Sequence, residues 1–310
     1  MSVLITGSMA YDTIMVFQDR FKDHILPDQV HILNVAFLVP ELRREFGGCA
    51  GNIAYNLKLL GGDPLIMATV GQDFSPYAKW LDECGINQDE IWGIENAYTA
   101  QAFITTDLDD NQITAFHPGA MSFSHQNSIP VDKDVELGTV SPDGKDGMIL
   151  HAQQFADAGI PFIFDPGQGM PMFSGDELLD ILKLARWVTL NDYEARLMEE
   201  KTGLSPQQLT EYVDAAIITL GGQGSNIFVK DGVVEIPPVT AKQVVDPTGC
   251  GDAYRAGLLY GMQNHLDWEI TGRIASLIGA IKVASAGTQN HAFTLDEFRS
   301  AYQQQFNSDF

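Results

Sequence analysis

Short apolar runs alternate with helical patterns along most of the chain. The runs that read as buried strands are residues 3–7, 64–70, 160–165, 187–191 and 215–220. Between two such runs, Ile53, Leu57 and Leu60 recur at helical spacing before Gly61 and Gly62. A second helical pattern, residues 74–81, ends before Gly85. Such alternation predicts an α/β fold with a doubly wound, mostly parallel sheet covered by helices on both faces.

Two stretches break this alternation, residues 11–46 and 98–117. In the second, two extended runs flank the turn-like residues 107–111, which is typical of a hairpin. We therefore expect a single domain over residues 1–310, with a small β-sheet lid formed by about 12–46 and 98–117. The connection at 132–147 has little apolar content and is expected to lie on the surface.

Residues 31–39 would form a lid strand that is apolar on both sides. One side could face a ligand and the other a second subunit, as in a homodimer formed through the lid. The alternative is packing on the chain's own core.

Composition narrows the possible functions. The 310 residues hold 18 Lys and Arg against 41 Asp and Glu, a net charge of −23, which disfavours a nucleic-acid partner. The apolar runs are too short to span a bilayer, and the first residues lack a signal-peptide pattern, so we expect no membrane partner and a cytoplasmic location. The three cysteines, Cys49, Cys84 and Cys250, form no metal-binding pattern.

The most informative segment is residues 244–257, VVDPTGCGDAYRAG, in which a Pro–Gly turn leads into a helical stretch. The first N–H groups of a helix lack partners, so residues 249–251 form a plausible anion cradle. Asp252 would repel an anion, which favours a role as a base that accepts a proton from an attacking hydroxyl. The alternative is that Asp252 only caps the helix.

Two further segments carry weaker signals. Gly47 and Gly48 suit a hinge or a close ligand contact, and Asn52 could hold a hydroxyl group. Asp12 follows the end of the first strand and could accept from two vicinal hydroxyls of a sugar. Ordinary roles in a turn or a helix cap are the alternatives for both.

Five motifs follow one another along the chain: Asp12, Gly47-Gly48 with Asn52, Asn191-Asp192-Tyr193-Glu194, residues 219–224 (TLGGQG) and residues 246–252. With these motifs in this order, the chain resembles the ribokinase-like carbohydrate kinases, also called the PfkB family. The resemblance is nearest to bacterial adenosine and nucleoside kinases. It implies ATP-dependent transfer of the γ-phosphoryl group to a primary alcohol, with the small sheet as a lid over the acceptor site.

The resemblance also implies a role for each matched residue. Asp252 would be the general base, and Gly249, Cys250 and Gly251 the anion hole, with Arg255 a candidate phosphate neighbour. Asn191 and Glu194 would position Mg²⁺ and phosphate, Glu194 through water. Residues that would bind ATP are Thr219, Gly221 and Gly224; Asp12 and Asn52 would hold the acceptor, with Gly47 and Gly48 as the lid hinge. Asp246 and Thr248 would be ligands of a monovalent cation such as K⁺, although Pro247 departs from the family pattern.

The lid residues bear on which alcohol is phosphorylated. Its apolar side chains include Phe103 and Phe116, which could stack on a base or only fill a lid core. Few cations are present there, which disfavours a sugar phosphate. We expect transfer to the 5′-hydroxyl of adenosine. A free sugar such as ribose or fructose is the first alternative, and a sugar phosphate or a non-catalytic nucleoside sensor ranks lower.

Overall fold

The computed structural model describes residues 1–25, 34–109 and 111–310. The strands are β1 (Ser2–Thr6), β2 (Ala10–Val16), β3 (Glu41–Gly47), β4 (Pro64–Val70), β5 (Asn87–Gly93), β6 (Ala100–Thr106), β7 (Gln112–His117), β8 (Val135–Val140), β9 (Phe162–Phe164), β10 (Trp187–Asn191), β11 (Ala215–Thr219), β12 (Ser225–Val229) and β13 (Gly232–Ile236). The helices are α1 (Phe21–His24), α2 (Cys49–Leu59), α3 (Ser75–Glu83), α4 (Lys145–Asp157), α5 (Gly175–Leu184), α6 (Asp192–Thr202), α7 (Pro206–Leu209), α8 (Cys250–Gln263), α9 (Trp268–Val283) and α10 (Leu295–Phe306).

The main sheet has nine strands in the order β13-β12-β11-β10-β9-β8-β1-β4-β5. The strands from β11 to β5 run parallel, whereas β12 and β13 are antiparallel additions at one edge. From β1 the chain continues to β4 on one side and later to β8 on the other, so the strand order reverses at β1. In such sheets ligands bind beyond the carboxyl ends of the strands near this reversal.

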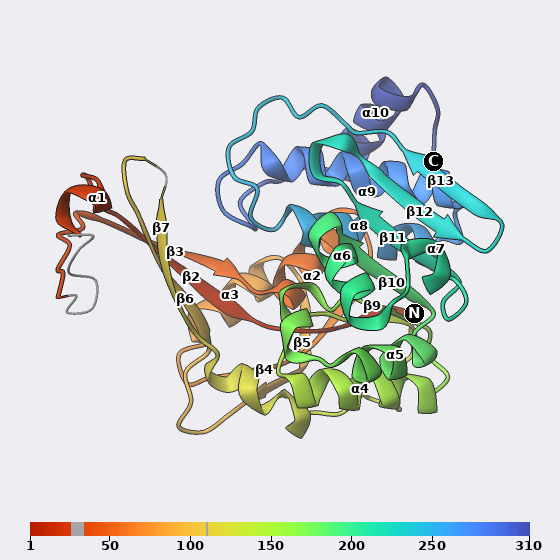
Figure 1. Cartoon of the computed structure of the whole chain (residues 1–310), viewed down its shortest axis with the longest axis horizontal. Helices are drawn as coiled ribbons and strands as arrows, with labels where there is room; N and C mark the ends of the chain where they lie inside the picture. Colours follow the sequence, from red (N-terminus) through yellow and green to blue (C-terminus); the bar gives the residue numbers. More distant parts are fainter. Residues whose placement is uncertain (26–33, 110) are drawn as a thin grey trace.

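Alternate residues of the strands pack against different helix layers. Val3 and Ile5 of β1 join a core cluster with α2, α3, α8 and α9, while Leu4 between them joins a second cluster with α4, α5, α6 and α7. Burying each of these side chains stabilises the fold by roughly 1.5–3 kcal/mol. The predicted doubly wound sheet with helices on both faces is therefore confirmed, and Figure 1 shows the two helix layers.

A separate four-stranded sheet in the order β3-β2-β6-β7 projects from the main body (Figure 1). The hairpin of β6 and β7 turns at Asp107, whose carboxylate accepts hydrogen bonds from the N–H groups of Asp109 and Asn111. The expected small second sheet is confirmed, and we call it the lid sheet.

Two expectations from the sequence are wrong. Residues 31–33 lie outside the described residues, and residues 34–39 form no strand; β3 begins only at Glu41. Phe37 instead packs on Phe17 and Phe21, which gives its ring an apolar environment without a sheet. The segment 132–147 is not a surface connection, because it contains β8, which lies between β1 and β9. Gly138 in that strand leaves the space that the ring of Phe155 fills.

None of the helices in the described part of the chain is both long and apolar enough to cross a membrane.

Candidate active site

Asp252 lies in the first turn of α8, where the chain enters the helix through Gly249. Gly249 is the N-cap residue and has φ 76°, a left-handed conformation that favours glycine. Asp252 is thus the third helical residue, and its Oδ2 accepts a hydrogen bond of 2.8 Å from Nδ2 of Asn52 on α2. Asp252 is not the N-cap residue of α8, which is Gly249, and its carboxylate contacts Asn52 instead. Burial raises the pKa of Asp252 to about 6, while the Asn52 hydrogen bond opposes the rise.

The backbone N–H groups around this turn form a candidate anion site. Those of Gly249, Gly251 and Asp252 have no hydrogen-bond partner among the described residues, but the N–H of Cys250 donates to the carbonyl of Pro247 at 3.1 Å. The N–H of Cys250, expected in the anion hole, therefore already has a partner in this structure, whereas that of Asp252 has none among the described residues.

A buried ion pair lies directly beneath this anion site. Arg255 of α8 donates from Nε and Nη2 to both carboxylate oxygens of Asp165, which follows β9. Its Nη1 is so near Gly251 that a Cβ there would lie 2.8 Å away. Asp165 was not found from the sequence, because its partner is 90 residues away in the chain.

The Asn191 and Glu194 motif forms the start of α6. The Asn191 side chain accepts from the N–H of Glu194 at 2.8 Å, and Glu194 accepts from the N–H of Asn191 at 2.7 Å. This capping box holds the buried Glu194 carboxylate 3.9 Å from Arg255. Burial and the charge of Asp165 raise the pKa of Glu194.

On the acceptor side, Asp12 of β2 lies against the glycine pair at the end of β3. A Cβ on Gly47 would be 2.7 Å from Oδ2 of Asp12, and one on Gly48, where φ is 86°, would be 2.5 Å from the carbonyl oxygen of Ser8. Only glycine therefore fits where the lid sheet joins α2. Burial, followed by the charges of Asp246 and Glu45, raises the pKa of Asp12 to about 6.

These groups line one continuous cavity of about 780 Å³. Of the residues expected from the sequence, it is lined by Asp12, Gly48, Asn52, Phe116, Asn191, Glu194, Thr219, Gly221, Thr248, Gly249, Gly251 and Asp252. The expected residues Gly47, Phe103, Gly224, Asp246 and Cys250 are not among the described residues that line it. Phe103 follows Ala102, which does line the cavity, and neighbouring strand residues point to opposite faces.

The charges of the cavity are mainly acidic. Its carboxylates are Asp12, Asp143, Asp165, Asp192, Glu194 and Asp252, and Arg255 is the cation among the described lining residues. Burial raises the pKa of Asp143 to about 7. The lid cations lie elsewhere: Arg20 and Lys22 pair with Asp109 at 2.8 Å.

The donor set suits a divalent cation that is held mainly by phosphate and water. Within residues 1–25, 34–109 and 111–310, no three His, Cys, Asp or Glu side chains gather as a metal centre. Mg²⁺ commonly uses only one or two carboxylates together with substrate phosphates. The buried Glu194 beside the anion site fits that pattern.

The expected monovalent-cation ligands have other partners. The carboxylate of Asp246 accepts from the N–H groups of Thr248 and Gly287, both at 2.9 Å. The ammonium of Lys282, which is fully buried, donates to the carbonyl oxygen of Asp246 at 2.7 Å and to that of Ser285 at 3.5 Å. The Lys282 ammonium already contacts the carbonyl oxygens of Asp246 and Ser285, so this group of residues does not fit a K⁺ site.

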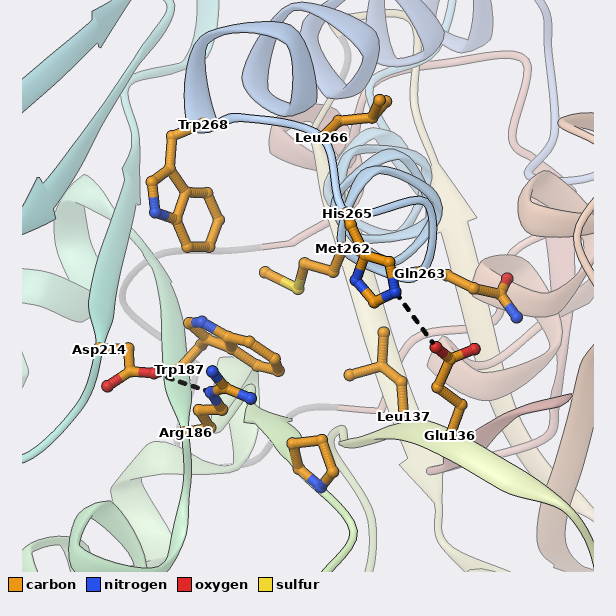
Figure 2. A pocket seen from close by; sticks show the side chains of 11 residues that line it. Glu136, Leu137, Arg186, Trp187, Asp214, Met262, Gln263, His265, Leu266 and Trp268 are labelled. Carbon is orange, nitrogen blue, oxygen red and sulfur yellow. Dashed lines mark hydrogen bonds and ion pairs between the residues drawn. The ribbon is translucent and has the colours of Figure 1, made fainter. Parts of the chain in front are cut away.

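A second cavity of about 330 Å³ lies at the amino ends of β8 and β10 and is shown in Figure 2. Trp187, the first residue of β10, and Trp268 of α9 face it, and the Arg186–Asp214 and His265–Glu136 pairs flank it. The larger cavity adjoins the last residues of β10 and β11, where the chemistry-bearing side chains gather.

Comparisons with known proteins agree with this geometry. A family model described as pfkB family carbohydrate kinase matches residues 6–294. The nucleoside kinase of Burkholderia thailandensis in complex with inosine is 50% identical with a TM-score of 0.90, over 99% of both chains. Its complex with ADP-inosine has a TM-score of 0.88 and 52% identity, over 99% of this chain and 97% of that one. The nucleoside kinase of Methanocaldococcus jannaschii is 33% identical over 268 residues, 85% of this chain and 87% of the relative.

Proposed function

The chain belongs to the pfkB family of carbohydrate kinases and has their ribokinase-like fold, and from this premise we propose that it transfers the γ-phosphoryl group of ATP to the 5′-hydroxyl of a purine nucleoside, with adenosine as its acceptor. One observation carries the proposal. Asp252, Gly249 and Gly251 lie together at the start of α8 and line the same cavity, which supports a base and an anion site that act on one phosphoryl group.

The acceptor half of the cavity favours a neutral alcohol. Asp12 and Asp143 would repel a second phosphate group, whereas vicinal hydroxyls of a ribose can donate to Asp12. The half-exposed ring of Phe116 and the side chain of Met121 offer an apolar surface for a base. The similarity to a nucleoside kinase that was solved with inosine also supports a purine nucleoside.

Asp252 would accept the proton of the attacking hydroxyl while the oxygen bonds to the γ-phosphorus and the bond to ADP breaks. The N–H groups of Gly249, Gly251 and Asp252 would stabilise the negative charge on the equatorial oxygens. Removing a comparable donor costs roughly 3–4 kcal/mol in the barrier. Arg255 would add positive charge beneath them.

Mg²⁺, held at Glu194 through water, would neutralise charge on the phosphates of ATP. Asn191, Thr219 and Gly221 would border the nucleotide, as the cavity lining suggests. Closure of the lid sheet over Asp12 would exclude water and limit hydrolysis of ATP. No step is assigned to K⁺.

A panel assay tests the proposal. The protein is incubated with Mg²⁺ and ATP together with adenosine, inosine, ribose, fructose or fructose 6-phosphate, and ADP and phosphorylated product are both measured. We expect adenosine 5′-monophosphate as the main product. Phosphorylation of only a sugar would overturn the nucleoside assignment, and tight nucleoside binding without product would favour a sensor.

A further inference from the structure

A continuous chain of buried hydrogen bonds ends on the carboxylate of Asp252. The indole Nε1 of Trp80, on α3, donates to Oε1 of Gln289 at 2.8 Å. Nε2 of Gln289 donates to Oδ1 of Asn52 at 3.0 Å, and Nδ2 of Asn52 donates to Asp252 at 2.8 Å. Gln289 is 2% exposed and Asn52 is 4% exposed, so the hydrogen bond between these two amides is shielded from water.

The direction of this chain is determined by its first member. An indole nitrogen can only donate, so it orients the oxygen of Gln289 toward Trp80 and the nitrogen of Gln289 toward Asn52. Asn52 must then turn its own oxygen to Gln289, which leaves its NH₂ group facing Asp252. Side-chain amides have two nearly isosteric orientations, and here the hydrogen-bond network selects one.

Gln289 also reaches the lid sheet. Its Nε2 lies 2.6 Å from the hydroxyl of Tyr77, and that hydroxyl donates to the carbonyl of Gly47 at 2.9 Å. Because the hydroxyl proton goes to Gly47, Tyr77 accepts from Gln289, which is consistent with the orientation set by Trp80.

We propose that Gln289 is a positioning residue for phosphoryl transfer, because it holds the Asn52 amide in the orientation that donates to the base. This inference rests on the proposed function with Asp252 as general base. Without Gln289, Asn52 can rotate by half a turn and present its oxygen to the carboxylate. The ionised base then loses a hydrogen bond and gains a repulsive neighbour.

Other charged or titratable groups also face Asp252. They are Arg255 on its own helix, Asp165 after β9, Cys49 on α2, Cys250, Tyr77 and Lys282 on α9. Of these, Tyr77 accepts a hydrogen bond from Gln289, so Gln289→Met alters it as well as Asn52. A change in the protonation of Asp252 that Gln289→Met and Trp80→Phe share therefore reports the Asn52 contact, because Trp80 donates to Gln289 and its removal leaves Tyr77 in place.

The test compares Gln289→Met and Trp80→Phe with Tyr55→Phe. The control removes the buried hydroxyl of Tyr55, which donates to the carbonyl of His291. The Tyr55 ring stacks on Trp80, but Tyr55 is not part of the hydrogen-bond chain to Asp252. For each variant, kcat and KM are measured across pH 5–9, together with the melting temperature.

For Gln289→Met we expect kcat to fall about tenfold, since a hydrogen bond to a charged group is lost. The acidic limb of the kcat/KM profile should move up by about one pH unit. The KM for ATP should stay within about twofold. Trp80→Phe should shift the limb in the same direction and Tyr55→Phe should not. An unchanged limb in Gln289→Met, or an equal shift in Tyr55→Phe, would overturn the proposal.

Failure of the positioning role of Gln289 can be distinguished from failure of the proposed function. If the wild type phosphorylates a sugar and no nucleoside, the nucleoside assignment fails and the same profiles are recorded with that sugar. If it phosphorylates no alcohol, the pKa of Asp252 is followed by carboxyl-carbon NMR instead. A higher pKa in Gln289→Met then supports the positioning role, and an equal pKa refutes it.

Discussion

Replacing Asp252 by Asn tests the chemical role of the carboxylate without changing the shape of the site. The side chain keeps its size, and its carbonyl oxygen can still accept the hydrogen bond that Asn52 donates at 2.8 Å. Binding of nucleoside and ATP should therefore stay within about threefold of the wild type. Loss of the proton acceptor should lower kcat by about 10²- to 10⁴-fold.

The pH dependence of the wild-type rate gives a second quantitative prediction. As the proposed base, Asp252 would act in its ionised form, and burial raises its pKa to about 6. The rate should therefore be about half maximal at pH 6 and about a tenth of maximal at pH 5. The residual rate of Asp252→Asn should lack this acidic limb.

The same raised pKa implies an effect on stability. A carboxyl group whose pKa is higher in the folded state stabilises the fold at low pH, and this contribution is lost as the pH rises through about 6. Asp252→Asn should thus have a higher melting temperature than the wild type at pH 8, with a smaller gain at pH 5.

The assay quantifies ADP and nucleoside monophosphate by chromatography from pH 5 to 8.5, with calorimetry of both proteins in the same buffers. A kcat of Asp252→Asn within tenfold of the wild type would refute the role of this carboxylate as base. A flat wild-type profile between pH 5 and 7 would refute the reasoning from burial.

Four further outcomes are expected. Removing divalent cations with EDTA should abolish transfer and added Mg²⁺ should restore it, because the cavity is acidic; full activity in EDTA would contradict this. Exchanging K⁺ for Na⁺ at constant ionic strength should change kcat less than about twofold, since the Lys282 ammonium occupies that place; a large K⁺ activation would be the contrary result. Phe116→Ala should raise the KM for adenosine by about tenfold and Phe103→Ala by less than about twofold, as steady-state kinetics can check. Sedimentation should show a homodimer that Leu42→Asp weakens, because Leu42 of the lid sheet is 65% exposed; a wild-type monomer would rule this out.

Much of the fold and part of the site follow from local sequence patterns. The runs 64–70 and 187–191 match β4 and β10 because a buried parallel strand needs a continuous apolar segment wherever it lies. The unpaired N–H groups at the start of α8 were also predictable, since the first N–H groups of a helix lack intrahelical partners. The same local reasoning failed for 132–147, because Glu136, Gly138 and Thr139 interrupt the apolar run of β8 and polar residues flank it.

The contacts that orient the chemistry were decided by the tertiary structure alone. Asn52 and Asp252 are 200 residues apart, and Gln289 is 237 residues from Asn52. Arg255 of α8 and Asp165 are 90 residues apart in the chain and meet only in the folded protein. Periodicity along a chain reports which side of an element is buried, whereas the partner of a buried polar group depends on which layers meet there. For that reason the sequence indicated Asp252 as a candidate base, and only the folded chain showed which side chains contact it.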